Sequence, residues 1–313
     1  MRRLPSLLIL AVSFATLPSS VFAAEAQKPA AAPRKPSLPA PTHANVSYGP
    51  HARNVFDLWL AKSDKPTPVF VHIHGGGWLS GDKSSLSPQL LETMLGRGVS
   101  VVSVNYRYAS IAPLPAPVHD AARAIQFIRS KAGEWNLKKD RFVAMGGSAG
   151  ACTSLWLNYH DDLAKPGSDD PVARESTRLS GAVGMSGQTA IDPKLIVGWV
   201  GDEVMKHAMI SRAVGAKDGA EALARYEEFR ELYAEFSAIN HVDKNDPPTF
   251  LSYPKTDPVP APNPGSAIHH VAFGEKLKEK AEAAGAKVIL QVGGKGAPAG
   301  MSVNDFLLRQ LLE

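Results

Sequence analysis

Residues 142–150 read FVAMGGSAG, an apolar run that leads into a glycine-serine turn. The last five residues match G-x-S-x-G, with Ser148 between glycines two positions away on each side. Such a serine occupies a sharp strand-to-helix turn, where its hydroxyl is exposed and the glycines let strand and helix approach closely. We therefore predict a strand over 142–145, a helix over 149–159, and Ser148 as a nucleophile between them.

A second glycine-rich stretch, HGGGW at 74–78, directly follows a predicted strand over 68–73. Successive glycines after a strand can turn two backbone N–H groups toward one point. Such donors stabilise the oxyanion that forms when a serine attacks an ester carbonyl. We assign this role to the N–H groups of Gly76, Gly77 and Ala149.

Two histidines lie near this glycine loop. His74 opens the loop, and we expect its imidazole to bond to backbone and hold the loop in place. His72, two residues earlier on the same strand, is predicted to be a core histidine with satisfied hydrogen bonds. Neither histidine is assigned to catalysis.

Short apolar runs alternate with helical patterns from residue 46 onward. This alternation predicts a mostly parallel sheet with helices on both faces. The run 54–60 is expected at a sheet edge, and 268–284 is expected to be one helix that ends at Gly285, a natural C-cap. Residues 193–240 are helical and charged on one side, which predicts a small helical cap over one rim of the sheet. The remaining predicted strands are 99–105, 179–185, 249–253 and 287–292, and the remaining helices are 118–132 and 303–312.

With these motifs the chain resembles the α/β-hydrolase fold over residues 46–313, in the branch of hormone-sensitive-lipase-like and feruloyl-esterase-like carboxylesterases. The resemblance rests on HGGGW at 74–78 and GGSAG at 146–150. It also rests on NYRY at 105–108 and SAINHV at 237–242. It implies an esterase or lipase-like serine hydrolase that cleaves carboxylic esters through an acyl-serine intermediate, without a cofactor.

The resemblance also implies a catalytic aspartate just after the strand predicted at 249–253. Asp257, followed by proline, stands there. Its carboxylate would fix the tautomer of a catalytic histidine and stabilise the imidazolium. Because Asp-Pro is also a common turn former, only the position of Asp257 in the chain favours the catalytic interpretation.

The family's histidine, expected after the last strand, is missing. The corresponding stretch, 293–300, reads GGKGAPAG, and no histidine follows His270. Lys295 cannot simply replace it, because an ordinary lysine is protonated near neutral pH. His269 and His270 are the best candidates, since they follow Asp257 in a connection that lies on the same rim of a parallel sheet as the nucleophile. We expect one of these two to be the base.

Two other functions stay open. If the triad is incomplete, the protein is a catalytically weak or inactive binding protein on an inherited fold, because loss of one triad member costs several orders of magnitude in rate. The other is a serine peptidase of the same fold. For the esterase, a small or medium acyl ester is the favoured substrate, either a small molecule or an ester on a polysaccharide, because no broad apolar lid stands out.

The first 45 residues are predicted to lie outside the folded domain. Residues 1–23 have a twin arginine, an apolar stretch over 7–17 and small residues at 21 and 23, the pattern of a signal peptide. That apolar stretch is about half of the roughly 20 residues needed to span a bilayer. Residues 24–45, rich in proline and alanine, are predicted to be a linker. We therefore expect a secreted or periplasmic protein with no membrane span after signal removal.

Composition narrows the class of partner. The 313 residues carry 34 basic and 30 acidic side chains, and a net charge of +4 is too balanced to indicate nucleic-acid binding. The single cysteine, Cys152, excludes internal disulfides and cysteine-based zinc sites. We expect no metal and no cofactor, and the sequence leaves the oligomeric state open.

Overall fold

The computed structural model describes residues 38–313. The predicted signal peptide (1–23) and most of the predicted linker (24–45) lie outside the described residues. The linker prediction extends too far, because β1 (His43–Ser47) is part of the sheet. Pro39 O also accepts a hydrogen bond from the Trp59 indole at 2.9 Å.

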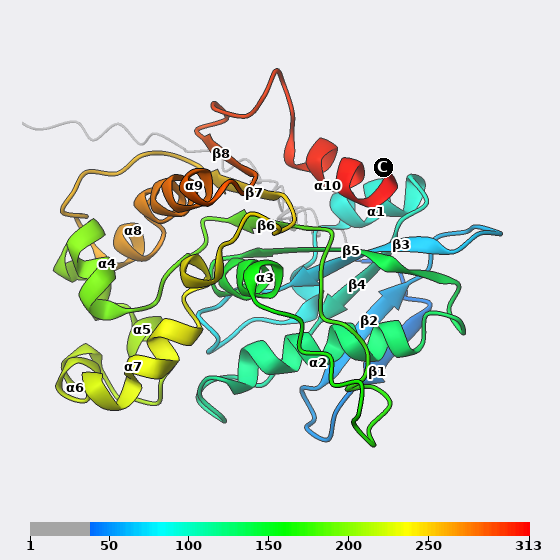
Figure 1. Cartoon of the computed structure of the whole chain (residues 1–313), viewed down its shortest axis with the longest axis horizontal. Helices are drawn as coiled ribbons and strands as arrows, with labels where there is room; N and C mark the ends of the chain where they lie inside the picture. Colours follow the sequence, from blue (N-terminus) through cyan, green and yellow to red (C-terminus); the bar gives the residue numbers. More distant parts are fainter. Residues whose placement is uncertain (1–37) are drawn as a thin grey trace, which may run out of the picture. The chain divides into compact units, whose positions relative to one another are not determined.

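The strands of the described residues form one eight-stranded sheet in the order β1-β2-β4-β3-β5-β6-β7-β8 (Figure 1). Neighbours from β4 through β8 are parallel, whereas β2 is antiparallel to both β1 and β4. The expectation that 54–60 lies at an edge is therefore wrong, because the unpredicted β1 covers that strand. The further bounds are β2 Val55–Trp59, β3 Thr67–Ile73, β4 Ser100–Val104, β5 Leu137–Gly147, β6 Gly181–Met185, β7 Thr249–Tyr253 and β8 Val288–Val292.

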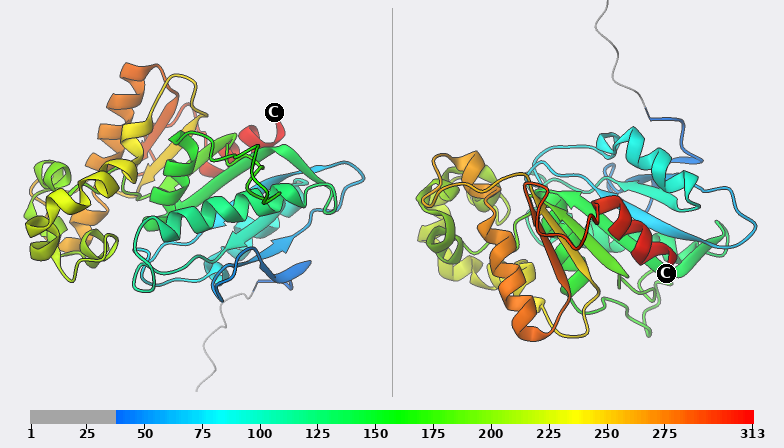
Figure 2. Two further views of the ribbon diagram at one scale, coloured as in Figure 1. Left: turned by 60° about the horizontal axis from the view of Figure 1, so that its bottom comes forward. Right: turned by 90° about the horizontal axis from the view of Figure 1, so that it is seen from above.

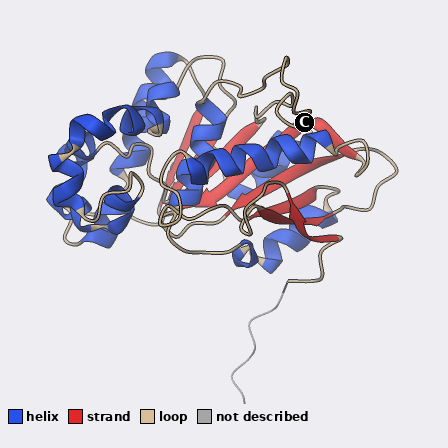
Figure 3. Ribbon diagram, turned by 90° about the horizontal axis from the view of Figure 1, so that it is seen from below, coloured by secondary structure: helices blue, strands red, loops and turns tan. Residues whose placement is uncertain are grey.

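Helices cover both faces of the sheet, as predicted. α1 (Pro88–Gly96) and α10 (Val303–Leu312) lie on one face, and α2 (Ala116–Ser130) and α3 (Ala149–Tyr159) on the other (Figure 2). Figure 3 shows helices on both sides of the strands. α9 (Ala272–Ala284) packs into the same hydrophobic core as α2 and α3. None of the helices in this part of the chain is long and apolar enough to cross a membrane.

β3 connects the two hydrophobic cores. Val69, Val71 and Ile73 belong to the core on the α2–α3 face, whereas Phe70 belongs to the core on the α1–α10 face. Successive residues of a strand point to opposite faces, so an inner parallel strand needs apolar residues almost throughout. The run 68–73 meets this need and carries the glycine loop to the carboxyl edge of the sheet.

The segment between β6 and β7 corresponds to the predicted cap. It contacts the loops at the sheet rim: Leu114 N donates to Ala213 O at 2.8 Å, and Ala261 N donates to Val200 O at 2.8 Å. Its elements are α4 Pro193–Val200, η2 Asp202–Lys206, α5 Ala208–Arg212, α6 Gly219–Ala224, α7 Tyr226–Glu235 and η3 Ala238–His241, where η denotes a 3-10 helix. Outside this segment, the 3-10 helix η1 (Lys83–Ser85) precedes α1.

The predicted helix 268–284 is interrupted in the structure. α8 (Pro264–Ile268) ends just before His269, and α9 begins only at Ala272. α9 ends at Gly285, whose φ of 84° is the left-handed conformation of a glycine C-cap. The interruption leaves the two candidate histidines in a short turn between helices.

Candidate active site

Ser148 occupies the turn between β5 and α3. Its φ of 53° and ψ of −124° lie in a region that costs a non-glycine residue roughly 1–3 kcal/mol. Its N–H donates to Met185 O, at the end of β6, at 3.0 Å. The backbone at Ser148 thus makes the sharp, strained turn that a nucleophile elbow requires.

The glycines of the elbow are required by close backbone contacts. A Cβ on Gly146 would lie 2.2 Å from the carbonyl carbon of Gly150, and one on Gly150 would lie 2.1 Å from Ile73 O. A Cβ on Gly75 would lie 2.6 Å from Gly147 O. All three distances are far below normal contact, so a larger residue at any of these positions would push the elbow away from the loop after β3.

The loop after β3 has backbone donors that find no partner in the described part of the chain. Gly76 and Gly77 have φ of 98° and 62°, and their N–H groups have no hydrogen-bond acceptor among residues 38–313. Ala149 is the first residue of α3, where an N–H group has no partner within its own helix. Because β3 and β5 are neighbours in the sheet, these donors stand on adjacent strand ends. Such an arrangement is what an oxyanion hole needs.

A polar network holds this loop. Tyr106 donates its hydroxyl hydrogen to His74 O at 2.7 Å, and the two rings stack with centroids 4.2 Å apart. His74 Nδ1 lies 2.8 Å from Gly75 O, and Arg53 donates to His74 Nε2 at 3.3 Å. Burial lowers the pKa of His74 to about 4, so the ring is neutral at pH 7 and can accept from Arg53. The predicted structural role of His74 is confirmed.

Asp257 lies after β7, and its carboxylate faces a lysine. Lys255 Nζ donates to Asp257 Oδ1 at 2.9 Å, and the aspartate side chain is only 11% exposed. No hydrogen bond joins this carboxylate to an imidazole in the described part of the chain. The backbone carbonyl of Asp257 instead accepts from His270 Nε2 at 2.9 Å. The structure thus brings the aspartate loop to the histidine pair through the main chain.

His270 has both ring nitrogens engaged with backbone. Nε2 donates to Asp257 O, and Nδ1 accepts from Ala272 N at 3.0 Å. The residue is buried, with 2% of its surface exposed. His270 therefore has no free lone pair for Ser148 in this conformation, and its hydrogen bonds hold the start of α9.

His269 has the hydrogen-bonding pattern of a base. Its Nδ1 lies 3.0 Å from Ser186 O, the carbonyl directly after β6. A hydrogen on Nδ1 satisfies that carbonyl and leaves Nε2 as the basic nitrogen. Met185, the preceding residue, accepts the hydrogen bond from Ser148 N. His269 and the nucleophile are therefore tied to the same strand end.

Ser186 and Gln188 contact His269 and were missed by the sequence analysis. Gln188 Nε2 donates to Ile268 O at 2.6 Å and lies 3.4 Å from His269 Nδ1. Ser186 has a φ of 47°, and its carbonyl oxygen faces His269 Nδ1. No local sequence motif identifies Ser186 or Gln188 as a site residue, because both are more than 80 residues away from His269 in the sequence and contact it only in the folded chain.

The segment between β6 and β7 also reaches the site. The His207 ring packs edge-on against the His269 ring, with centroids 6.4 Å apart. Burial, and to a smaller extent the nearby His269, lower the pKa of His207. Two residues further along, Met209 Cβ lies 3.4 Å from the place where Gly77 would carry a Cβ. This segment therefore covers both the candidate base and the loop with the free donors.

The stretch 293–300 begins as a turn after β8. Gly293 N donates to Tyr253 O at 2.9 Å, and Val292 N donates to Lys295 O at 2.8 Å. The turn adjoins the end of β7, close to where the aspartate loop starts. It offers main chain and a lysine there, and no imidazole.

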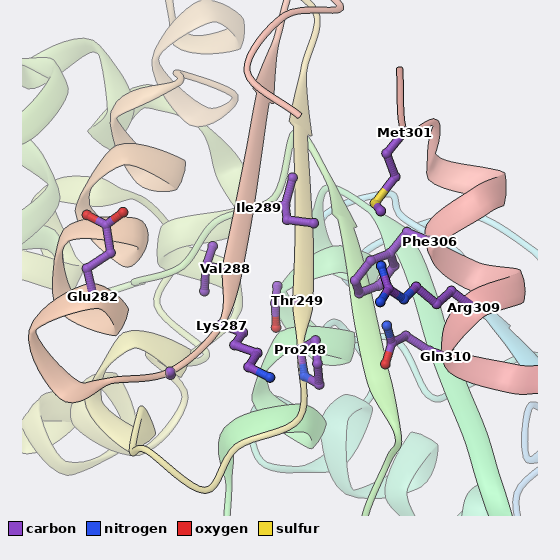
Figure 4. Close-up of a pocket in the computed structure, with 11 residues that line it drawn as sticks. Pro248, Thr249, Glu282, Lys287, Val288, Ile289, Met301, Phe306, Arg309 and Gln310 are labelled. Atoms are coloured by element: carbon purple, nitrogen blue, oxygen red, sulfur yellow. The ribbon is translucent and has the colours of Figure 1, made fainter. Parts of the chain in front are cut away.

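A separate groove lies between α10 and strands β7 and β8 (Figure 4). Thr249 and Val288, which line it, are the first residues of their strands. Phe306 and Gln310 line its opposite side. Ser148 follows the carboxyl end of a parallel strand, so this groove belongs to the opposite rim of the sheet and is not part of the candidate site.

Comparison with known proteins gives one family match. The BD-FAE family model matches residues 56–270, which include both glycine motifs and both candidate histidines. Among curated proteins, Esterase LipQ of Mycobacterium tuberculosis is 25% identical over 223 residues, or 69% of this chain and 49% of LipQ. Probable carboxylic ester hydrolase LipM of the same organism is 24% identical over 226 residues, or 68% and 47%. The chain spans about half the length of these curated relatives.

A solved structure supports the architecture. A truncated carbohydrate esterase from gut microbiota has a TM-score of 0.68 at 21% identity, over 87% of this chain and 96% of that chain. At this level of identity the likeness concerns the fold alone.

Proposed function

Because the chain belongs to the BD-FAE family and has the α/β-hydrolase fold, we propose that it hydrolyses carboxylic esters through an acyl-serine intermediate. One observation carries this proposal: the strained Ser148, with φ of 53°, stands beside the N–H groups of Gly76 and Gly77, which have no acceptor among residues 38–313, on the neighbouring strand end. Backbone strain of this kind persists only where the surrounding structure enforces it, and it is common at active sites.

In the proposed reaction Ser148 is the nucleophile and His269 the base. Ser148 Oγ forms a bond to the ester carbonyl carbon while His269 Nε2 takes the hydroxyl proton. The N–H groups of Gly76, Gly77 and Ala149 stabilise the oxyanion. The imidazolium then gives its proton to the departing alcohol as the ester C–O bond breaks. Water, deprotonated by the same histidine, attacks the acyl-serine, releases the acid and restores the serine.

The Ser186 carbonyl takes over, in this proposal, the orienting role that the sequence resemblance gives to Asp257. A hydrogen bond from His269 Nδ1 to a carbonyl fixes the tautomer as a carboxylate does. A neutral carbonyl stabilises the imidazolium less than a charged carboxylate would. We therefore expect a slower esterase than one with a complete Ser-His-Asp triad. Asp257 acts as the acid only if its carboxylate leaves Lys255 when substrate binds.

A small or medium acyl ester, free or linked to a carbohydrate, is the proposed substrate. Met209 packs beside Gly77, and this restricts the space next to the oxyanion donors. The similar gut-microbial structure is that of a carbohydrate esterase, which supports a sugar-linked ester for this chain. We further propose that residues 1–23 direct the protein out of the cytoplasm, where polysaccharide esters are accessible.

Labelling with a fluorophosphonate probe tests the nucleophile without knowledge of the substrate. We expect rapid labelling at Ser148. The Ser148→Ala variant should lose labelling, and its hydrolysis of p-nitrophenyl acetate should fall by at least about 10³-fold. Ser154→Ala, a change on the helix that follows Ser148, is the matched control and should keep both the labelling and the hydrolysis of p-nitrophenyl acetate. Well-folded protein that stays unlabelled would contradict the proposal.

A catalytically weak binding protein is the second candidate. It is favoured by one observation: within residues 38–313, no hydrogen bond joins Ser148 Oγ to an imidazole. Such a protein would bind short esters without turnover, and the probe would not label it. If labelling occurs, comparing p-nitrophenyl esters with aminoacyl anilides distinguishes an esterase from a peptidase.

A further inference from the structure

His160, Glu235 and His241 form a cluster of metal-binding side chains outside the candidate active site. His160 directly follows α3, Glu235 is the last residue of α7, and His241 is the last residue of η3. One ring nitrogen of each histidine and one carboxylate oxygen of Glu235 lie within 4.8 Å of one another. Three segments that are distant in sequence thus bring two imidazoles and a carboxylate together.

Both ring nitrogens of His160 face oxygen atoms, an arrangement that suits a bound cation. Its Nδ1 lies 2.8 Å from Asp161 O, and its Nε2 lies 2.9 Å from Glu235 Oε1. A neutral imidazole carries one N–H group, so it can donate to only one of these two oxygens. The other nitrogen would face an oxygen with no hydrogen between them, unless a second proton or a metal ion bridges the pair.

His241 is oriented in a similar way. Its Nε2 lies 2.6 Å from the backbone carbonyl of Glu235, so Nε2 carries the hydrogen and Nδ1 keeps its lone pair. A histidine that binds a metal through one nitrogen usually donates the other N–H to a carbonyl or carboxylate. Both histidines of the cluster have such a carbonyl partner. Trp156 further holds the His160 ring by stacking on it, with centroids 4.2 Å apart.

We propose that this cluster binds a divalent transition-metal ion, with zinc as the favoured ion. The ligands are His160 Nε2, a carboxylate oxygen of Glu235 and His241 Nδ1, and a water molecule completes a tetrahedron. Zinc–nitrogen and zinc–oxygen bonds of about 2.0–2.2 Å place the ligand atoms about 3.3 Å apart. The ligand atoms of the cluster, which lie within 4.8 Å of one another, would have to move closer together around a bound ion. This site departs from the expectation of no metal, which rests on the single cysteine. The three proposed ligands are far apart in the sequence and form no local motif.

The metal would have a structural role. α3 begins directly after Ser148, and His160 lies at its other end. At a rise of about 1.5 Å per residue, His160 is therefore about 18 Å along the helix from the nucleophile. Glu235 and His241 belong to the last part of the segment between β6 and β7. Zinc would fasten the end of this segment to the helix that carries the nucleophile.

Zinc titration of the purified protein, without a histidine tag and after dialysis against chelator, tests the proposal. Calorimetry should show one zinc ion per chain with micromolar or tighter affinity. The thermal unfolding midpoint should rise by about 5 °C or more at a hundredfold excess over the dissociation constant. Calcium should do neither, because it prefers oxygen ligands. X-ray absorption should show two imidazole nitrogens on the bound zinc.

Variants decide which residues bind the ion. His160→Ala, His241→Ala and Glu235→Gln should each weaken zinc binding by at least about tenfold. The Glu235 side chain is 40% exposed, so this last variant should fold even if the others do not. His119→Ala is the control, because His119 packs near the same Trp156 ring but lies outside the three-residue group. No zinc binding, or binding equally strong in Glu235→Gln, would overturn the proposal and leave an ion pair bridged by a proton.

Discussion

The two halves of the candidate site are held by different kinds of contact. The first half, Ser148 and the loop 74–78, depends on close backbone approaches that only glycine permits, in addition to the hydrogen bonds that hold the loop at His74. The second half, His269 and Asp257, is held by hydrogen bonds to carbonyls and by an ion pair with Lys255. The first half therefore tolerates little change in sequence, whereas the second half can exchange one side chain for another.

This difference makes a displaced histidine physically reasonable. An imidazole needs one oriented hydrogen bond and access to the serine in order to act as a base. The turn between α8 and α9 provides the hydrogen bond through Ser186 O, next to the strand end that accepts from Ser148 N. The turn after β8, where the family's histidine is expected, lies at the same rim of the sheet, because Gly293 N donates a hydrogen bond to Tyr253 O at the end of β7.

The largest expected effect separates the two neighbouring histidines. His269→Ala should lower kcat for p-nitrophenyl acetate by about 10³-fold and leave the free energy of unfolding nearly unchanged, because it removes the proposed base. His270→Ala should keep kcat within about tenfold but lose about 1–3 kcal/mol of stability, because it leaves buried backbone groups unpaired. Steady-state kinetics and urea unfolding measure both quantities. The reverse pattern would assign the base to His270.

The next effect tests the glycine loop. Gly76→Ala should lower kcat by about 10²-fold, because its new Cβ would lie 2.3 Å from Ser80 O and the oxyanion donor would move. Gly98→Ala is the matched control: Gly98 also has a positive φ, 76°, but has nothing within 4 Å of the added atom. It should cost about 1–2 kcal/mol of stability and no activity. Equal kinetic loss in both variants would mean that the loop acts through stability alone.

A smaller effect is expected for the aspartate. Asp257→Asn should lower kcat by less than about tenfold if the Ser186 carbonyl orients His269. In a complete Ser-His-Asp triad the same change costs about 10⁴-fold, because the wrong tautomer results. A loss near that value would show that the carboxylate leaves Lys255 during turnover. The second half of the site would then be a conventional triad assembled by the substrate.

The smallest effect concerns pH and the stability of the strand that carries the glycine loop. Burial lowers the pKa of His72 to about 4, and its Nδ1 bonds with Ser103 Oγ at 2.8 Å, as expected of a satisfied core histidine. The unfolded chain takes up this proton near pH 6.5, so the stability from His72 is complete above that pH and is lost as the pH falls toward 4. Between pH 6.5 and 5 the loss is about 2 kcal/mol.

Urea unfolding at pH 7 and pH 5 measures this loss. His72→Asn should reduce the difference between the two pH values by about 2 kcal/mol. His74, whose pKa is also about 4, should still contribute its own pH-dependent loss of stability in that variant. An unchanged pH dependence would mean that His72 is protonated equally in the folded and unfolded states.

Much of the fold could be predicted because local patterns carry it. The strand 249–253 and the helices 149–159 and 303–312 match the structure to the residue, since apolar periodicity and glycine boundaries mark them. The helix predicted over 268–284 was wrong in its first turn, because the periodicity runs on past the break after α8. β1 was missed because its sequence lies in a proline-rich segment and its pairing with β2 is non-local.

The sequence alone determined the elbow and the loop with the free donors, because both depend on glycine conformations that neighbouring residues set. Only the tertiary structure distinguishes the contacts of His269 from those of His270, since their partners, Ser186 O and Asp257 O, follow different strands. The cluster of His160, Glu235 and His241 could not be predicted from the sequence, because its members come from three separate segments. Side chains that are distant along the chain share a site only after the sheet and its helices have brought them together.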